Sequence, residues 1–213
     1  DQRIEALLSA AGLNAIRVDK VSKKELESEL RVAEPDNTPV VHQGVMAICR
    51  PAETYDESYL NALIERVEKP FLLILDGVTD PHNLGACLRS ANAAGVDAVI
   101  IPRDNAVGLT PAVRKVACGA AEITPLIRAK NLARCMDTLK QAGIWVMGAA
   151  GETDQSLYSL DLLGPIALVL GAEGSGLRRL TREKCDCLFA IPMQGGVESL
   201  NVSVAAGISL FEA

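Results

Sequence analysis

The sequence predicts an α/β fold in which helices cover both faces of a mostly parallel β-sheet. Three observations lead to this prediction. From residue 71 onward, short apolar runs alternate with segments of helical periodicity. Hydrophobic residues make up 49% of the 213 residues, whereas aromatic residues make up only 3%. The core must therefore consist of Leu, Ile, Val and Ala, the residues that fill buried parallel strands.

The alternating pattern sets the order of the expected elements. Strands are expected at Phe71–Leu75, Ala98–Ile101, Thr124–Ile127, Trp145–Ala149, Ile166–Leu170 and Leu188–Ile191. Helices are expected at Leu84–Ala94, Pro111–Ala117, Leu132–Gln141, Leu177–Lys184 and from about Asn201 onward. Thr110 supports one helix start, because threonine is a good N-cap and a proline follows it. Trp145 lies within an apolar strand, so we expect it in the core.

The start of the chain predicts a smaller α/β domain. A helix comes first, and Ala15–Val18 reads as a short strand. Ser22 is the expected N-cap of a helix at Lys23–Leu30, with Glu25 in the capping-box position. Another strand is expected at Val40–Ile48. These elements are too few for a stable sheet, so we expect further strands upstream.

A change of pattern marks the expected domain boundaries. The small N-terminal domain is placed at 1–50 and is expected to be incomplete at its start. Residues 51–69 read as a linker that contains one helix. Residues 70–213 form the larger α/β domain.

Composition and charge exclude several classes of protein. No apolar run is long enough to span a bilayer, so no membrane partner is expected. The six cysteines are scattered without a Cys-x-x-Cys pair, which indicates reduced thiols in a cytoplasmic protein and no metal site. A net charge of −6 argues against non-specific coating of nucleic acid. Specific binding through basic patches such as the one from Arg178 to Lys184 stays open, although such a patch alone is more typical of a solvated helix face.

The stretch Ile191–Ala206 has the pattern of a ligand site. An apolar strand stops at Pro192, and we expect Gly195-Gly196 to let the backbone turn where side chains would clash. Polar residues then stand at a helix start, whose free N–H groups suit a small molecule or a phosphate. An ordinary β-turn-α connection has the same pattern. A dinucleotide-binding domain is excluded, because the first strand lacks a following G-x-G-x-x-G and the glycine-rich Gly171–Gly176 comes after the fifth strand.

Three segments carry a more specific signal when they are taken together. They are Asn83-Leu-Gly-Ala-Cys-Leu-Arg89, Leu168-Val-Leu-Gly-Ala-Glu-Gly-Ser-Gly176, and Ile191-Pro-Met followed by Ser199-Leu-Asn201-Val-Ser-Val-Ala. In this order, the segments resemble the three motifs of the SpoU/TrmH RNA 2′-O-ribose methyltransferases. Any one of them would be a weak signal, but their joint occurrence is highly specific.

This resemblance implies methyl transfer from S-adenosylmethionine to the ribose 2′-hydroxyl of a guanosine in 23S rRNA, with no metal. It also implies a homodimer and a C-terminal trefoil knot, which composition and periodicity do not predict. Val41-His42-Gln43-Gly44-Val45 resembles the end of an L30e-like RNA-binding domain. A tRNA 2′-O-ribose methyltransferase and a non-catalytic RNA-binding protein of the same fold stay open as alternatives.

The motif match also assigns catalytic roles. Arg89 is expected to stabilise the developing ribose alkoxide and to hold an adjacent phosphate, because a pKa above about 12 makes arginine a poor base. Asn83 is expected to contact the nucleotide or to cap its helix. Glu173 is expected to accept hydrogen bonds from Arg89 or the ribose, or to be a plain surface carboxylate. Ser199 and Asn201 complete the set, with a helix cap as the competing role for Ser199.

The resemblance implies that the cofactor is recognised largely through backbone atoms, which explains why these positions carry no conspicuous chemistry. The expected contacts are Gly171, Gly176, Ile191, Leu200 and the turn Ala149-Ala150-Gly151.

Overall fold

The computed structural model describes residues 2–33, 44–48 and 54–213. The chain divides into two compact units, Asp1–Pro51 and Ala52–Ala213. Within the described ranges, no helix is both long and apolar enough to cross a membrane.

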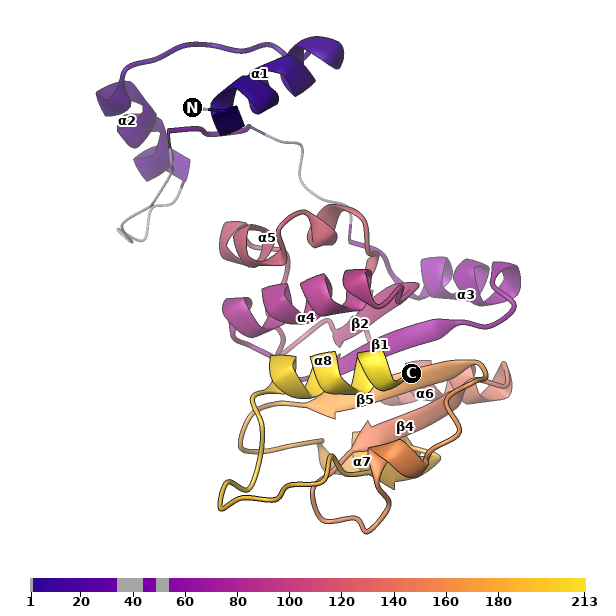
Figure 1. Cartoon of the computed structure of the whole chain (residues 1–213). Coiled ribbons are helices and arrows are strands. Elements are labelled where there is room, and N and C mark those ends of the chain that lie inside the picture. Colours follow the sequence, from indigo (N-terminus) through magenta and orange to yellow (C-terminus); the bar gives the residue numbers. More distant parts are fainter. Residues whose placement is uncertain (1, 34–43, 49–53) are drawn as a thin grey trace. The chain divides into compact units, whose positions relative to one another are not determined.

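The first unit contains α1 (Gln2–Leu13) and α2 (Lys23–Ala33), drawn in indigo and violet in Figure 1. The predicted capping box at the start of α2 is confirmed. The backbone N–H of Glu25 donates to Ser22 Oγ at 3.3 Å, and the N–H of Ser22 donates to Glu25 Oε2 at 2.7 Å. This reciprocal pair satisfies two N–H groups that the helix itself leaves free.

The strands predicted for the first unit are not found in its described part. The prediction at Ala15–Val18 is wrong: Ala15 has a left-handed φ of 52°, and the residues after it form no strand. No strand in the described part of this unit lies beside them to accept a ladder of hydrogen bonds. Of the strand predicted at Val40–Ile48, residues 40–43 lie outside the described residues, and residues 44–48 form no strand.

The second unit is built on a six-stranded parallel sheet with the strand order β3-β2-β1-β5-β4-β6. The strands are β1 (Phe71–Asp76), β2 (Ala98–Pro102), β3 (Leu126–Ala129), β4 (Trp145–Ala149), β5 (Ile166–Gly171) and β6 (Cys187–Phe189). In the middle of the sheet, Ile74 pairs in register with Ile100 on one side and with Val169 on the other. The predicted parallel sheet is confirmed. Each expected strand is present, although β3 begins at Leu126 rather than Thr124 and β6 ends at Phe189 rather than Ile191.

Helices cover both faces of this sheet (Figure 1). They are α3 (Glu57–Arg66), α4 (Pro81–Ala93), α5 (Pro111–Ala117), α6 (Leu132–Gln141), α7 (Arg179–Lys184) and α8 (Val202–Glu212). Alternate residues of β1 point to opposite faces. Leu73 and Leu75 belong to the core formed with α4, α5 and α8, whereas Leu72 and Ile74 belong to the core formed with α3 and α6.

The segment expected to act as a linker packs in part against the sheet. The N–H of Tyr55 donates to the carbonyl oxygen of Leu126 at 2.9 Å, which places Tyr55 beside β3. Leu60 and Leu63 of α3 are buried in the core beneath the sheet. Residues 54–66 therefore contribute to the second unit's fold.

Two further expectations about this unit are wrong. Trp145 is 58% exposed, because it is the first residue of β4 and stands at the end of the sheet, whereas Val146 behind it is buried. The helix expected from Leu177 begins only at Arg179. Arg178 is held in an extended conformation by Asp76, which accepts a hydrogen bond from its backbone N–H at 3.0 Å.

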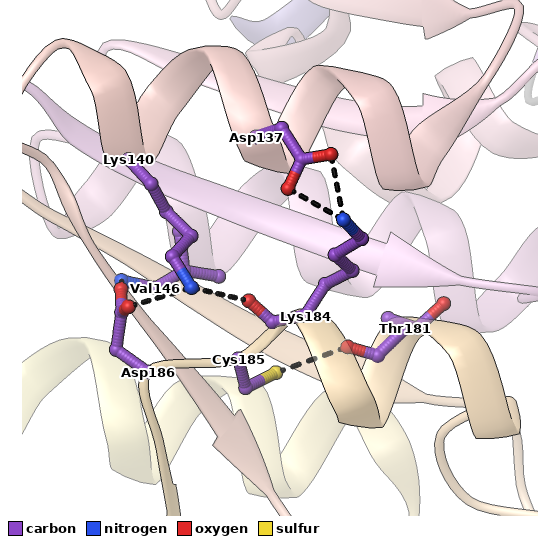
Figure 2. Close-up of polar contacts among 7 residues, drawn as sticks. All are labelled: Asp137, Lys140, Val146, Thr181, Lys184, Cys185 and Asp186. Atoms are coloured by element: carbon purple, nitrogen blue, oxygen red, sulfur yellow. Dashed lines mark hydrogen bonds and ion pairs between the residues drawn. The ribbon is translucent and has the colours of Figure 1, made fainter.

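The C-terminal end of α7 is fixed against α6 and β4 by two ion pairs, which Figure 2 shows. Lys184 Nζ donates to both carboxylate oxygens of Asp137, at 2.8 and 2.7 Å. Lys140 Nζ lies 2.8 Å from Asp186 Oδ1 and donates to the carbonyl oxygen of Lys184 at 3.2 Å. The other oxygen of Asp186 accepts the N–H of Val146 at 2.9 Å. These contacts hold α7 in place behind the loop that forms the candidate site.

Candidate active site

A cavity of 690 Å³ lies at the carboxyl ends of β4, β5 and β6. Three stretches far apart in the sequence line it, within 149–156, 170–182 and 189–205. In parallel α/β sheets, ligands bind at this edge, and a volume of this size suits a small molecule. All the residues expected to contact the cofactor line the cavity: Ala149, Ala150, Gly151, Gly171, Gly176, Ile191 and Leu200. Glu173 and Ser199 line it as well.

The loop after β5 turns back on itself so tightly that only glycine fits at its base. A Cβ atom on Gly171 would lie 2.1 Å from the carbonyl carbon of Gly176 and 2.3 Å from the nitrogen of Leu177. Ala172 and Gly176 form an antiparallel bridge, and Gly176 has a left-handed φ of 63°. The glycines of this motif therefore shape one wall of the cavity by backbone contact.

Asp76 anchors the far end of this loop. Its buried side chain, at the end of β1, accepts the backbone N–H of Arg178 at 3.0 Å and the Nε of Arg178 at 2.6 Å. The guanidinium of Arg178 forms an ion pair with the same carboxylate. Asp76 was not among the predicted site residues. The available signal was a carboxylate directly after a run of buried apolar residues, a position where a charge needs a partner.

Asn201 joins two of the motif segments to a third. Its Nδ2 donates to Asn83 Oδ1 at 2.9 Å and also to Glu173 Oε1. Its Oδ1 accepts the N–H of Ser203 at 2.9 Å and the Ser203 hydroxyl at 2.5 Å. Three of the five predicted catalytic residues are thus brought together, and Ser203, which sequence reasoning missed, fixes the orientation of the Asn201 amide.

The helix-cap alternatives are resolved by these contacts. Asn83 is not the N-cap of α4, because Asp80 holds that position and accepts the N–H of His82 at 3.0 Å. This hydrogen bond also holds the pKa of Asp80 below its ordinary value. Ser199 is not the N-cap of α8, because Asn201 occupies that position.

Arg89 lies apart from this cluster within the chain. It projects from α4 six residues after Asn83, its side chain is exposed, and its NH1 lies 3.7 Å from the sulfur of Cys118. Glu173 is bonded to Asn201 rather than to Arg89. Within one chain, Arg89 therefore lies on an accessible surface, separate from the polar cluster of Asn83, Glu173 and Asn201.

The Gly195-Gly196 pair differs from its expected role. A Cβ atom on either glycine would meet nothing within 4 Å, and neither residue has a left-handed φ. The expectation that side chains would clash there is wrong, because this segment runs over an open, exposed surface.

The charged side chains in the cavity lining are mainly acidic. The carboxylates of Glu152, Asp154, Glu173 and Glu198 line it, together with one cation, Arg182, which pairs with Glu152. This excess of negative charge suits a ligand that carries a positive charge. In the part of the chain that the structure describes, no group of three or more His, Cys, Asp or Glu residues is arranged to hold a metal ion.

Comparison with known proteins identifies the family. The model of the SpoU rRNA Methylase family matches residues 70–211. The chain belongs to the SpoU rRNA methylase family. SpoU relatives also match along the whole chain. The 23S rRNA (guanosine-2′-O-)-methyltransferase RlmB of Pseudomonas putida is 52% identical over 214 residues, which cover 100% of this chain and 83% of that protein. The enzyme of the same name from Pseudomonas aeruginosa is 54% identical over 213 residues, with 100% and 83% covered.

Solved structures of methyltransferases share the fold. The SpoU methyltransferase AviRb from Streptomyces viridochromogenes, in complex with AdoMet, matches with a TM-score of 0.66 and 28% identity. The match covers 71% of this chain and 59% of AviRb. An rRNA methyltransferase from Sinorhizobium meliloti matches with a TM-score of 0.69 at 21% identity, covering 99% of this chain and 76% of that one, which shows a common fold.

Proposed function

We propose that this chain transfers a methyl group from S-adenosylmethionine to the ribose 2′-hydroxyl of a guanosine in 23S rRNA. The observation that carries this proposal is the 52–54% identity to two RlmB enzymes along the entire chain. The geometry agrees with it, because two of the motif segments line one cavity at the carboxyl edge of the sheet, and Asn201 links them to Asn83 of the third segment. AviRb, which shares this fold, was solved with AdoMet bound.

The cavity fits S-adenosylmethionine in volume and in charge. Gly171, Ala150 and Ile191 line it, and we assign recognition of the nucleoside to backbone atoms at these positions. The acidic side chains in the lining, Glu173 and Glu198 among them, suit a cationic ligand. When bound, the cofactor supplies a methyl group on a positively charged sulfur, which needs no metal for its activation.

The residues of the motif segments have separate tasks in the proposed reaction. We assign to Arg89 the stabilisation of the alkoxide as the ribose oxygen loses its proton, together with contact to an adjacent phosphate. Its exposed position leaves it accessible to RNA. Asn201 donates a hydrogen bond to Oε1 of Glu173, so the second carboxylate oxygen is left to accept a hydrogen bond from the ribose hydroxyl. Asn83 and Ser203 keep Asn201 in that orientation.

Incubation with labelled S-adenosylmethionine and separate 23S rRNA, 16S rRNA and tRNA pools tests the substrate. Label is expected in 23S rRNA. Label in tRNA alone would overturn this assignment in favour of a tRNA methyltransferase, and no label in any pool would favour a non-catalytic RNA-binding protein.

The Arg89→Lys variant tests the catalytic role. We expect kcat to fall by about 10²–10³-fold, because lysine cannot reproduce the two-pronged contact of arginine. Calorimetry should find unchanged S-adenosylmethionine affinity. The matched control is Arg179→Lys, since Arg179 is exposed and, within the described part of the chain, its ion pair is with Glu183. Turnover retained in Arg89→Lys would rule out the role.

A homodimer is also part of the proposal. On α8, Val204 and Phe211 are 49% and 68% exposed, whereas Ala206 and Leu210 are buried. The two exposed residues are seven positions apart and therefore share one face of the helix. An apolar row of this kind supports burial against a second copy. Light scattering of the purified chain should give twice the monomer mass, and Phe211→Asp should shift it toward the monomer.

The trefoil knot, the RNA-binding role of residues 1–50 and the cytoplasmic location remain proposals. Support for the knot comes from the segment Phe189–Ala190. Its carbonyl oxygens accept hydrogen bonds from the N–H groups of Ala150 and Leu157, each at 2.8 Å. Both ends of the 150–157 loop therefore contact this segment. A crystal structure traced through this region tests the threading. The cytoplasmic location is supported by free cysteines in the described residues, three of which, Cys87, Cys135 and Cys185, have a pKa raised to about 12 chiefly by burial.

A further inference from the structure

A second cavity opens at the same carboxyl edge of the sheet, beside β2 and β3. It has a volume of 320 Å³. Its lining comes from the end of β2, the start of α6 and the start of α7, and consists of Pro102, Arg103, Asp104, Asn105, Lys130, Asn131, Leu132, Ala133, Arg178, Leu180 and Thr181. Nothing in the proposed methyl transfer uses this cavity.

Positive charge dominates its lining. Arg103, Lys130 and Arg178 carry three cations, whereas Asp104 is the single carboxylate among the lining residues. Asp104 contacts Arg103 only at 3.7 Å, and both side chains are more than half exposed. An ion pair of this kind is weak, so Arg103 can easily leave Asp104 and bind another anion. Arg178 is 50% exposed although it pairs with Asp76, so part of its guanidinium stays open to a ligand.

Lys130 supplies the least compensated of these charges. Lys130 is exposed, and in the described ranges its ammonium forms no ion pair within 4 Å. Asp56 lies near enough to be influenced by it. Hydrogen bonds from Ser58 chiefly hold the pKa of Asp56 below its ordinary value, and Lys130 adds a smaller effect in the same direction.

The backbone around the cations is held in place by specific hydrogen bonds. Arg128 NH2 donates to the carbonyl oxygen of Arg103 at 2.7 Å, and Glu57 Oε1 accepts the N–H of Lys130 at 2.6 Å. Asn131 caps α6 through its bond to the N–H of Arg134 at 3.0 Å. The Nε of Arg128 is buried without a hydrogen-bond partner, so this residue adds a further positive group next to the Arg103 backbone that its NH2 contacts. These bonds fix the backbone that carries Arg103 and Lys130, which lowers the cost of ordering the site when an anion binds.

We propose that this second cavity binds a backbone phosphate of the RNA substrate. Arginine and lysine are the residues that recognise phosphate, and arginine adds paired donors. The loop that ends in Arg178 joins the two cavities, because Gly171–Leu177 line the first and Arg178 lines the second. An RNA strand whose ribose lies at the first cavity would thus extend along the same edge of the sheet. The chain has a net charge of −6, so this local basic site would guide the strand where the surface as a whole repels it. The inference rests on the proposed function in its choice of RNA as the ligand.

The double variant Arg103→Ala/Lys130→Ala tests this site in the full chain. We expect its Kd for a 23S rRNA fragment, measured by fluorescence anisotropy, to rise roughly tenfold, and the slope of log Kd against log salt to fall by about one to two. The KM for the RNA should rise in parallel, whereas the affinity for S-adenosylmethionine stays as in the wild type. Arg179→Ala is the matched control, since Arg179 is 84% exposed and lies outside the cavity. Circular dichroism checks that each variant is folded.

The possible results separate this inference from the proposed function. Wild-type methylation with an unchanged RNA Kd and salt slope in the double variant would overturn the phosphate site and leave the methyltransferase proposal standing. Equal losses in the double variant and in Arg179→Ala would also overturn it, because the effect would then be general charge. Saturable binding of inorganic phosphate that the double variant loses without any change in RNA affinity would reassign the cavity to a free anion. Absence of methylation in the wild type, with the tenfold loss of RNA binding still present, would keep the site and refute the activity.

Discussion

Two glycine-containing segments border the same cavity, and they differ in how the rest of the chain holds them. In the Gly171–Gly176 loop, the backbone folds onto itself until a side chain at Gly171 would overlap Gly176. The buried carboxylate of Asp76 fixes the end of this loop by accepting hydrogen bonds from the backbone N–H and the Nε of Arg178. In the Gly195-Gly196 segment, open space surrounds both glycines. A glycine pair in a sequence can thus mark either an enforced close approach or an exposed connection.

This difference separates the rigid wall of the cavity from its exposed side. Residues 192–199 are all exposed, whereas β5 leads into the first loop from the centre of the sheet. Substitutions in the first loop should therefore act through folding and cofactor binding together. Substitutions in the second segment should leave the fold unchanged.

Gly171→Ala is expected to have the largest effect. Its Cβ would meet backbone atoms of Gly176 and Leu177 rather than a movable side chain, so the loop must open. We expect a loss of about 3 kcal/mol or more in the free energy of unfolding, and loss of measurable S-adenosylmethionine binding. Urea denaturation and calorimetry measure the two effects. A variant with wild-type stability would show that the loop does not fold back in this way.

Asp76→Ala should come next. It leaves the backbone N–H and the guanidinium of Arg178 without their acceptor, at a cost of about 1–3 kcal/mol. Half of the Arg178 side chain stays in contact with solvent, which limits the loss. The control is Glu183→Ala, which breaks the exposed pair with Arg179 and should cost under about 0.5 kcal/mol. If both variants unfold at the same denaturant concentration, the anchor has no special role.

Gly176→Ala is expected to cost about 1 kcal/mol, because an L-residue at a φ of 63° is strained although space around it is open. Gly176→Asn should cost less, since asparagine tolerates the left-handed region better. Thermal unfolding of the two variants provides the test. An alanine variant that is as stable as the asparagine variant would contradict the strained backbone.

The alternation of apolar runs and helices was enough to predict the sheet, because buried strands need continuous hydrophobic residues. Pro111–Ala117 and Leu132–Gln141 have the predicted bounds. Where the sequence misled, tertiary contacts decided the outcome. Arg178 reads as part of a helix, but its bonds to Asp76 keep it extended. Trp145 reads as core, but its place at the end of β4 exposes it.

The candidate site was only partly predictable for a similar reason. The segments that line the cavity could be found only from motif resemblance. Their residues are mostly small and apolar, so their chemistry alone gives no signal. The junction at Asn201 joins residues 118 positions apart, and no local pattern states which partners its amide will find. Asp76 and Ser203 act on other site residues, so their importance appears only when the fold places them side by side.

Gly195→Ala gives the smallest expected effect and the sharpest control for the comparison. The native backbone suits an L-residue, so alanine mainly reduces the conformational entropy of the unfolded chain, which should stabilise the protein by about 0.4–1 kcal/mol. Urea denaturation measures this against Gly171→Ala in the same buffer. Because a glycine is replaced by the same residue in both variants, the opposite signs would isolate the effect of local packing. A destabilisation of Gly195→Ala comparable to that of Gly171→Ala would mean that the second segment is also closely packed, and the distinction between the two sides of the cavity would fail.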